Sequence, residues 1–507
     1  MAIKNRLVAG ALLAMCVSTA SAQTVDGRNF GIDGFAAVEG IQGTNHYRAG
    51  GTTGGAGGKV VYAANFSQLQ AYLQASDPYV IIVDKDITTG IKCYVDGLDT
   101  GHLCDTQDGS QGVETTYGER IMVAPNKTLI GVVNSKTNQA PLFSRITFVM
   151  QCPDNVIIRN CRFTMNGAPI LKSGENKIVA WRDGAQVEVG DPDCIGIQAD
   201  KTSAKTDWGA HIWVDHCEFF NGNAANKDRY DGLLDCKNNV QWMTISYNYF
   251  HNHDKSCLFG KGNSDIYDGC RTITMHHNFF ENIDGSRLPL QRGGHLHYYN
   301  NYQTGCADGW DLRTKAVGYV EACYFENSKA PILTDGGGTI NINTQDGYDL
   351  VYKSCLRLIE GYNNIDGGKV DEVLPLPTNS WIPTQTASSY TVNHLDKTVD
   401  VPELAKKYSG AGKIEIYKTY TETIPAENIN EYANAVANKL TGNTYDEKGN
   451  TITKVETGIS NVSAGGVATT VYYTINGMKV AAPEYGIYIR KTQNTDGTVS
   501  TSKVVIR

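Results

Sequence analysis

Two arginines stand close together in the run Arg287-Leu-Pro-Leu-Gln-Arg-Gly-Gly-His295, inside a region rich in strand-forming residues. A lysine, Lys255, precedes this run. Guanidinium and ammonium groups gathered in this way bind carboxylates or phosphates. The run therefore predicts a site that holds an anionic ligand.

Four aspartates lie upstream in two close pairs, Asp191-Pro-Asp193 and Asp231-Gly-Leu-Leu-Asp235. Carboxylate oxygens are the ligands that a hard cation such as Ca²⁺ prefers. A single aspartate in a loop rich in glycine and asparagine is usually a solvated turn residue. Because all four accompany the arginines, we interpret them together as a metal site. An acidic polymer bridged to the protein by calcium would use both groups of side chains.

A short repeated pattern indicates which elements position these residues. Each copy has a few strand-forming residues, then Cys or Asn, then an aromatic residue within two positions. The marked residues, which are 31, 30, 23 and 22 positions apart, are Cys217, Asn248, Asn278, Asn301 and Cys323. This drifting period is typical of stacked solenoid coils.

The repeat favours an all-β fold, a right-handed parallel β-helix. In such a fold aromatic residues stack inward, and an asparagine repeated at one turn bonds its counterparts in neighbouring coils. A β-sandwich is the alternative, but tight turns without hairpin spacing argue against it.

The first residues have the layout of a cleavable secretory signal over residues 1–22. Lys4 and Arg6 precede an apolar stretch, and Ala20-Ser21-Ala22 follows it. We expect a secreted or cell-surface protein, since no later apolar run has the length of a membrane span. Loss of Lys4 and Arg6 leaves 43 basic and 53 acidic residues, a formal charge of −10. This charge argues against a nucleic-acid partner.

Thirteen cysteines are present, and loss of Cys16 with the signal leaves twelve. An even number in an exported chain is compatible with disulfides, and the pair Cys93 and Cys104 is the strongest candidate. Several others fall at the repeated strand position, where we expect small buried side chains rather than bridges.

The main domain is expected over residues 23–420. A capped helix begins near Asn65 and could cover the first coil, and a second begins near Asp400. A helix and a polar linker should occupy residues 421–455. A small β-rich module should fill residues 456–507, with a hairpin at Asn476-Gly477. The module resembles the C-terminal sorting domains of type IX secretion cargo; the alternative is an accessory module without an export role.

Four motifs resemble the polysaccharide lyase family 1 pectate lyases in their order and spacing, over roughly residues 30 to 415. They are Ile212-Trp-Val-Asp-His216, Asp231-Gly-Leu-Leu-Asp235, Ser246-Tyr-Asn-Tyr249 and Arg287-Leu-Pro-Leu-Gln-Arg-Gly-Gly294. The resemblance implies Ca²⁺ held by four aspartates, with Arg287 as the catalytic base and four cations that bind substrate. The implied calcium ligands are Asp191, Asp193, Asp231 and Asp235, and the implied substrate-binding cations are Lys255, Arg292, Lys237 and Arg313.

The implied reaction is β-elimination in α-1,4-polygalacturonate, which yields 4,5-unsaturated oligogalacturonates. Calcium on the uronate carboxylate would acidify the proton at C5, the base would remove it, and the glycosidic oxygen would leave from C4. An arginine base requires that Lys255, Arg292 and calcium disfavour its charged form. The alternative is that both arginines only clamp carboxylates.

Three other activities are compatible with a β-helix. A pectin lyase would act on methylated polymer, which has little use for an acidic calcium site. A polygalacturonase would carry a Gly-His-Gly run, which is missing, and its Asn-Thr-Asp would not lie in the tail at Asn494. A non-catalytic carbohydrate-binding β-helix would not need Arg287 beside Lys255. We expect a monomer that acts on polygalacturonate.

Overall fold

A computed structural model describes residues 28–413 apart from 89–91, 96–112, 117–118, 135, 167–176, 183–184, 191–192, 200–207, 223–229 and 267–270. It also describes residues 24–25, 444–445, 451–452, 467–474, 479–480, 486–494 and 499–506. Contacts divide the chain into two compact units, Met1–Thr451 and Ile452–Arg507.

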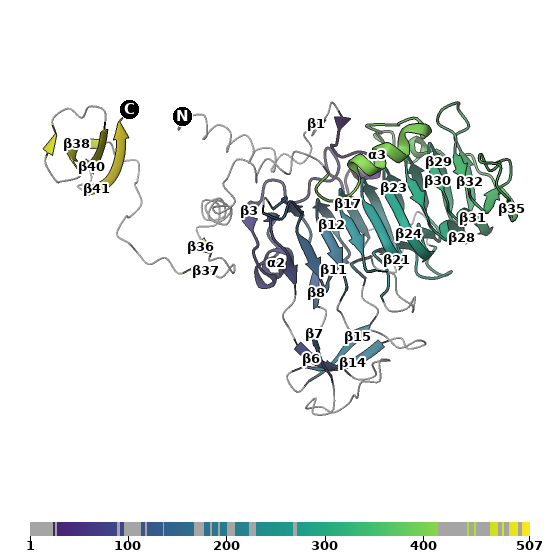
Figure 1. The fold of residues 1–507 in the computed structure, drawn as a ribbon, viewed down its shortest axis with the longest axis horizontal. Coiled ribbons are helices and arrows are strands. Elements are labelled where there is room, and N and C mark those ends of the chain that lie inside the picture. Colours follow the sequence, from purple (N-terminus) through teal and green to yellow (C-terminus); the bar gives the residue numbers. More distant parts are fainter. Residues whose placement is uncertain are drawn as a thin grey trace. The chain divides into compact units, whose positions relative to one another are not determined.

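Three parallel sheets form the first unit, and the chain passes through them coil after coil (Figure 1). The ten-stranded sheet contains β3 Lys59–Tyr62, β4 Tyr79–Val83, β9 Lys127–Gly131, β12 Asp154–Arg159, β17 Gly209–Asp215, β20 Val240–Ser246, β23 Thr272–His276, β26 His295–Tyr299, β29 Val317–Glu321 and β32 Thr339–Ile342. The nine-stranded sheet contains β5 Ile87–Thr88, β10 Leu142–Ser144, β13 Arg162–Thr164, β18 Glu218–Phe220, β21 Tyr249–Lys255, β24 Phe279–Ser286, β27 Tyr302–Thr304, β30 Tyr324–Glu326 and β33 Val351–Lys353.

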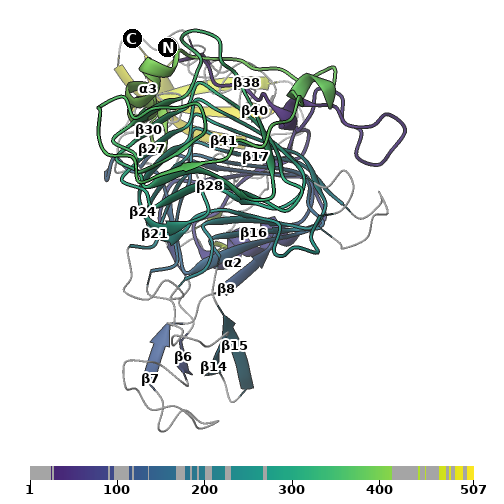
Figure 2. The ribbon, with the colours of Figure 1, turned by 90° about the vertical axis from the view of Figure 1, so that its right-hand side faces the viewer.

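The eight-stranded sheet contains β8 Glu119–Met122, β11 Ile146–Gln151, β16 Ile195–Gln198, β19 Leu234–Lys237, β22 Leu258–Phe259, β25 Leu290–Gln291, β28 Asp308–Arg313 and β31 Ala330–Gly336. Strands β34 Arg357–Ile359 and β35 Glu372–Leu374 form a separate parallel pair after the last coil. Figure 2 looks toward this end of the stack. The expected right-handed parallel β-helix is confirmed.

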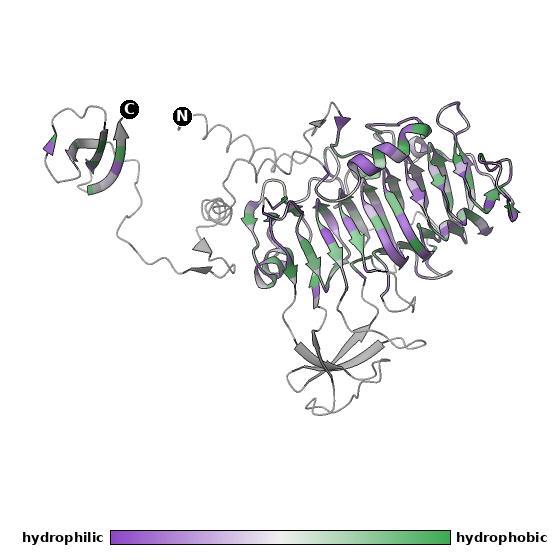
Figure 3. Ribbon diagram, in the orientation of Figure 1, coloured by the Kyte–Doolittle hydropathy of each residue, from purple (hydrophilic) through white to green (hydrophobic). Residues whose placement is uncertain are grey.

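The interior of the coils is built from the repeated pattern. Phe163, Phe219, Phe250 and Phe280 stack in consecutive coils with ring centroids 5.0 Å apart at each step. Hydrophilic residues alternate with these inward side chains, so both kinds occur within single strands (Figure 3). Burial of the apolar face holds the coils together.

An asparagine ladder runs along one turn, as the repeat predicts. The Asn248 amide donates to Asn278 Oδ1 and the Asn278 amide donates to Asn301 Oδ1, each at 3.0 Å. Cys161, Cys217 and Cys323, at the same repeated position, are buried and carry free thiols. The proposed Cys93–Cys104 bridge lies outside the described residues, because nothing is placed for Cys104 or for the Cys93 side chain.

Helices lie where the sequence predicts them. Helix α2 (Phe66–Gln74) begins after Asn65, whose side chain accepts a hydrogen bond from the Gln68 amide, and it buries Leu69 and Leu73 against the first coils. Helix α3 (Val401–Tyr408) follows the short helix η3 (Thr398–Asp400) and packs on the outer aromatic residues of the nine-stranded sheet. Two other short helices are η1 Phe35–Ala37 and η2 Pro383–Gln385. Among the described residues, no helix is long and apolar enough to cross a bilayer.

A small antiparallel sheet in the first unit was not expected from the sequence. It consists of β6 Lys92–Val95, β7 Val113–Thr116, β14 Lys177–Arg182 and β15 Ala185–Gly190. Two excursions of the chain between coils contribute these strands, and none of the four strands belongs to a copy of the repeat that reveals the coils. Two short pairs are β1 Thr24–Val25 with β2 Arg28–Asn29, and β36 Thr444–Tyr445 with β37 Thr451–Ile452.

The second unit is a four-stranded antiparallel sheet. Its strands are β38 Val467–Thr474, β39 Lys479–Val480, β40 Gly486–Asn494 and β41 Val499–Ile506. Pairing of Tyr472 with Val480 joins β38 to β39, as expected for a hairpin around Asn476-Gly477, whose own residues lie outside the described set. The helix predicted within residues 421–455 and the signal at residues 1–22 also lie outside it.

The outer face of the ten-stranded sheet is closed by two segments from the ends of the first unit. Arg28 and Asp396 form an ion pair of 2.6 Å, and His277 Nε2 lies 2.8 Å from the same carboxylate.

Burial lowers the pKa of His277 to about 4, although Asp396 opposes that shift. The imidazole is therefore neutral in the folded protein at pH 5 and above.

We expect His277 to make the protein sensitive to acid. Because the folded-state pKa is lowered from 6.5 to about 4, the unfolded chain binds one more proton between these values, and stability falls as pH decreases through this window. His277→Asn, which tolerates the left-handed backbone of this position (φ 52°), should reduce the slope of unfolding free energy against pH by up to ~1.4 kcal/mol per pH unit. Denaturant unfolding between pH 7 and 4.5 measures it. Parallel curves for the two proteins would contradict this expectation.

Candidate active site

The predicted base Arg287 and the neighbouring Lys255 lie where the nine-stranded sheet turns into the eight-stranded sheet. Lys255 ends β21, and Arg287 directly follows β24. Lys255 pairs in register with Ser286, so the two cationic residues come from neighbouring coils. Asp235 lies in β19 of the adjoining eight-stranded sheet and pairs with Gly196 in β16.

Three of the four predicted carboxylates meet in one cluster. Oxygen atoms of Asp193, Asp231 and Asp235 all lie within 4.8 Å of one another. Asp235 is fully buried, whereas Asp193 and Asp231 remain partly accessible. The fourth predicted ligand, Asp191, lies outside the described residues.

The cluster offers ligand atoms for a cation. Asp235 Oδ1 accepts the Leu258 amide at 2.9 Å, but buried Oδ2 accepts no hydrogen bond from any described residue. A Cβ atom on Gly232 would lie 2.0 Å from Asp235 Oδ1, so only glycine at position 232 leaves space for this carboxylate. Carboxylate oxygens are the ligands that Ca²⁺ prefers, and one of these oxygens is buried without a hydrogen bond from any described residue.

The pKa values in the cluster reflect burial first, and then the neighbouring carboxylates and cations. Burial, together with the Asp231 carboxylate and against Lys237, raises the pKa of Asp193 to about 6. Burial and the Asp193 carboxylate raise the pKa of Asp235 well above its usual range. Burial acts in the same direction on Asp231, but Arg287 and Lys255 outweigh it and lower the pKa of that carboxyl. A divalent cation among the three would favour their charged forms.

Arg287 and Lys255 converge on Asp231. Arg287 Nη1 lies 3.1 Å from Asp231 Oδ1 and 4.0 Å from Asp235 Oδ2, while Lys255 Nζ lies 3.5 Å from Asp231 Oδ1. Arg287 has φ 75°, which non-glycine residues rarely adopt and which is common at functional sites. The expected crowding of cations is present, and the nearest partners of Arg287 are the carboxylates of Asp231 and Asp235.

The Lys237 side chain faces the carboxylates of the cluster. Its Nζ lies 3.4 Å from Asp193 Oδ2 and 3.6 Å from Asp235 Oδ2. Although burial opposes the shift, the three aspartates raise the pKa of Lys237. Lys237 thus neutralises part of the cluster in this structure.

Arg292 and Arg313 extend the basic surface along the eight-stranded sheet. They directly follow Gln291 and Leu312, which pair in register, so they stand on adjacent coils about 4.8 Å apart. Arg292 Nη1 donates to the Gly260 carbonyl at 2.9 Å, and Arg313 Nε donates to Asp311 at 2.7 Å. Burial and the neighbouring Arg313 lower the pKa of Arg292.

His253 belongs to the site but was not singled out from the sequence. Its Nε2 lies 2.7 Å from the Asp231 carbonyl oxygen, and its ring is buried. Burial lowers the pKa of His253 to about 4, so the neutral ring donates Nε2–H to that carbonyl. The signal available was its place two residues before Lys255 on the same strand, but period-two spacing alone does not distinguish a supporting histidine from a core residue.

Residues 35–344 match the sequence pattern of a family described as pectate lyase. The chain is 30% identical over 414 residues to a pectate trisaccharide-lyase of Bacillus licheniformis, across 80% of this chain and 95% of that protein. It is 27% identical over 381 residues to a pectate trisaccharide-lyase of Thermotoga maritima, across 72% and 85%. A solved pectate lyase bound to hexasaccharide shares the fold with a TM-score of 0.50 and 21% identity, across 75% and 97%.

Proposed function

The chain belongs to the pectate lyase family, and we propose that it cleaves polygalacturonate by calcium-assisted β-elimination at the site formed by Asp193, Asp231, Asp235 and Arg287. It is a polysaccharide lyase, and pectate is its substrate. The observation that carries the calcium part is the buried Asp235 Oδ2, which accepts no hydrogen bond from any described residue inside a cluster of three carboxylates.

Asp193, Asp231 and Asp235 would hold the cation, with Asp191 as the further ligand that family resemblance implies. Bound calcium would supply positive charge beside the uronate carboxylate and so make the adjacent C5–H bond more acidic. With the carboxylates occupied, Lys237 would be released from Asp193 and Asp235 to contact a sugar carboxylate.

The remaining cations bind and orient the polymer. Arg292 and Arg313 stand on adjacent coils, so they can engage carboxylates of different sugar units along the groove. Lys255, held at 3.5 Å from Asp231, would contact the uronate at which elimination occurs. With the polymer held by these contacts, the C5 proton of that unit would face Arg287.

Arg287 acts as the base in this proposal. Its guanidine nitrogen takes the proton from C5, and the electron pair of the C5–H bond forms the C4–C5 double bond. The glycosidic oxygen leaves C4 with the electrons of the C4–O bond and takes a proton from water, to which Arg287 returns its own. Guanidinium groups normally stay protonated, so the reaction requires that the carboxylates now facing Arg287 be neutralised. Alkaline conditions favour the neutral form that a base requires, so activity should be highest there.

Product analysis tests the reaction type. Elimination yields oligogalacturonates that absorb in the near ultraviolet and are lighter by one water than the hydrolysis products. We expect such products from polygalacturonate and much less reaction on highly methylated pectin. New reducing ends without absorbance would indicate hydrolysis instead, and faster cleavage of methylated pectin would indicate a pectin lyase.

His253 offers a test of how the calcium site is supported. We expect His253→Ala to weaken calcium binding roughly 10- to 100-fold, the usual range for groups that orient metal ligands, because Asp231 loses the hydrogen bond to its carbonyl. Calorimetric titration with calcium measures this directly. His253→Gln, which keeps an N–H donor, should recover part of the loss. Unchanged calcium affinity in the alanine variant would contradict the role.

Export and targeting complete the proposal. The signal at residues 1–22 would deliver the chain out of the cytoplasm, and the C-terminal module would act as a type IX sorting domain. The protein would then act at the cell surface or outside it, as a monomer. N-terminal and C-terminal sequencing of the exported protein tests both segments, since it identifies the signal cleavage site and any removal of the module.

A further inference from the structure

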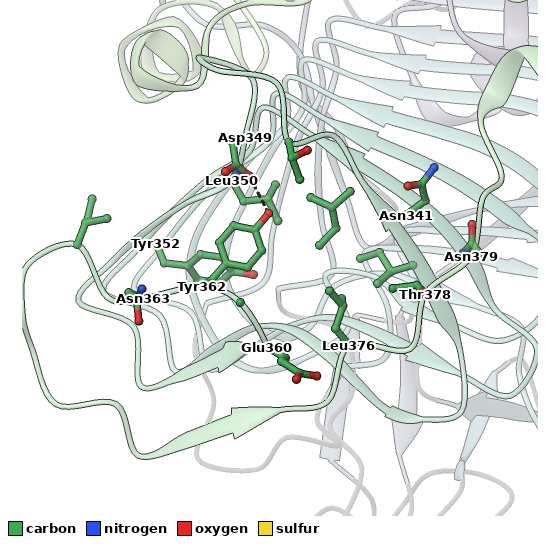
Figure 4. A pocket seen from close by; sticks show the side chains of 15 residues that line it. Asn341, Asp349, Leu350, Tyr352, Glu360, Tyr362, Asn363, Leu376, Thr378 and Asn379 are labelled. Carbon is green, nitrogen blue, oxygen red and sulfur yellow. Dashed lines mark hydrogen bonds between the residues drawn. The ribbon is translucent and has the colours of Figure 1, made fainter.

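A separate cavity of about 630 Å³ lies at the C-terminal end of the coil stack (Figure 4). The last strands of two sheets, β32 and β33, contribute to it together with residues 360–365 and 376–379. Strand β33 is three strands beyond β24 in the nine-stranded sheet, which corresponds to about 14 Å at the usual strand spacing. The cavity is therefore distinct from the site around Arg287.

Two tyrosines form the aromatic part of this cavity. The rings of Tyr352 and Tyr362 have centroids 5.3 Å apart, and Figure 4 shows them side by side. The Tyr362 hydroxyl donates to Asp349 at 2.7 Å. The Tyr352 hydroxyl is buried and has no hydrogen-bond partner among the described residues, although Tyr352 lines the cavity.

The other lining residues combine apolar surface with hydrogen-bonding groups. Leu376 and Ile365 supply apolar surface, while Asn363, Asp349 and Glu360 supply amide and carboxylate groups. None of the described lining residues is a lysine or an arginine. This composition contrasts with the basic surface around Arg287 and would repel a uronate carboxylate.

We infer that this cavity binds a neutral sugar unit. A pyranose ring presents C–H faces that pack on aromatic and aliphatic side chains, and hydroxyl groups that pair with amides, carboxylates and a phenol. The volume falls within the range of small-ligand pockets. Two carboxylates without an opposing cation select against an acidic sugar, so the ligand differs from the uronate bound in the catalytic groove.

Ligand-observed NMR and calorimetric titration on the full chain test the site. The probes are galactose, glucose, arabinose and xylose, with galacturonate as an acidic and glucosamine as a cationic comparator. We expect saturable binding of at least one neutral sugar and weaker binding of galacturonate, which the two carboxylates repel, whereas glucosamine reports how far those carboxylates contribute. Absence of binding by all neutral sugars, or tighter binding of galacturonate than of galactose, would overturn the inference.

Single substitutions test whether the sugar binds in this cavity. Tyr362→Ala should abolish binding, whereas Tyr362→Phe, which keeps the ring, should retain it. Glu360→Gln changes one exposed side chain and should weaken binding without affecting folding. Tyr348→Ala, which changes the neighbour of Asp349 but lies outside the lining, is the matched control. Binding that persists in Tyr362→Ala would refute the assignment.

Cleavage of polygalacturonate should stay at the wild-type rate in all these variants, because none of the altered residues belongs to the catalytic groove. The two proposals therefore fail separately. A protein that cleaves pectate but binds no neutral sugar would refute only this inference, and sugar binding without pectate cleavage would refute only the proposed function.

Discussion

Arg287→Lys is expected to lower kcat on polygalacturonate roughly 10²- to 10⁴-fold, the range for loss of a general base. Lysine keeps a positive charge in reach of Asp231, which Arg287 now contacts at 3.1 Å, but it removes the planar nitrogen pair that would receive the C5 proton. KM should change far less, since Arg292, Arg313 and Lys255 are the residues proposed to bind the substrate. Initial rates from near-ultraviolet absorbance over a range of substrate concentrations separate the two constants.

The division between kcat and KM distinguishes the base from a carboxylate clamp. An arginine that only binds substrate would raise KM and leave kcat nearly unchanged. Arg162→Lys is the matched control, because Arg162 pairs with Glu218 at 3.3 Å on the nine-stranded sheet and has no contact with the cluster. Its rates should equal those of the wild type.

Asp235→Asn is expected to remove the stabilisation that calcium gives. In the wild type, free calcium at 100 times its Kd should raise the unfolding free energy by ~2.7 kcal/mol. The variant keeps the side-chain shape but loses the buried charge, so calcium should add almost nothing and pectate cleavage should be lost. Thermal unfolding with calcium and with chelator measures the difference.

The stability of Asp235→Asn in chelator is a second test. Because burial and Asp193 raise the pKa of Asp235 well above its usual range, its charged form destabilises the metal-free fold at alkaline pH, and Asp235→Asn should be at least as stable as wild type there. Asp335→Asn, an exposed aspartate of β31, is the control and should respond to calcium normally. Equal calcium stabilisation of Asp235→Asn and wild type would rule out Asp235 as a ligand.

Much of the fold follows from one repeated turn. The asparagines at 248, 278 and 301 can only satisfy their amides together if consecutive coils stack in register, which is how the structure uses them. The small sheet formed by β6, β7, β14 and β15 was missed because its strands carry no such positional marker and pair antiparallel. Strand pairing between segments far apart in sequence leaves little local trace.

The site was predicted by residue type, but its contacts were not. The resemblance implied one site for Asp193, Asp231 and Asp235, whose carboxylates lie together. It also implied a substrate contact for Lys237, but not that Lys237 lies 3.4 Å from Asp193. Side-chain direction at a β-helix corner depends on how the turn bends, and the positive φ of Arg287 could not be predicted from sequence. His253 supports Asp231 through a backbone carbonyl, a contact that carries no sequence signature.

The most direct test of calcium-assisted elimination is the initial rate of near-ultraviolet absorbance on polygalacturonate at alkaline pH, measured in calcium, then in excess chelator, then after calcium is restored. We predict growth of absorbance in calcium, its loss in chelator and full recovery on restoration. Absorbance that grows equally in chelator would contradict the calcium site at Asp193, Asp231 and Asp235. Cleavage of the polymer without any absorbance would contradict elimination itself.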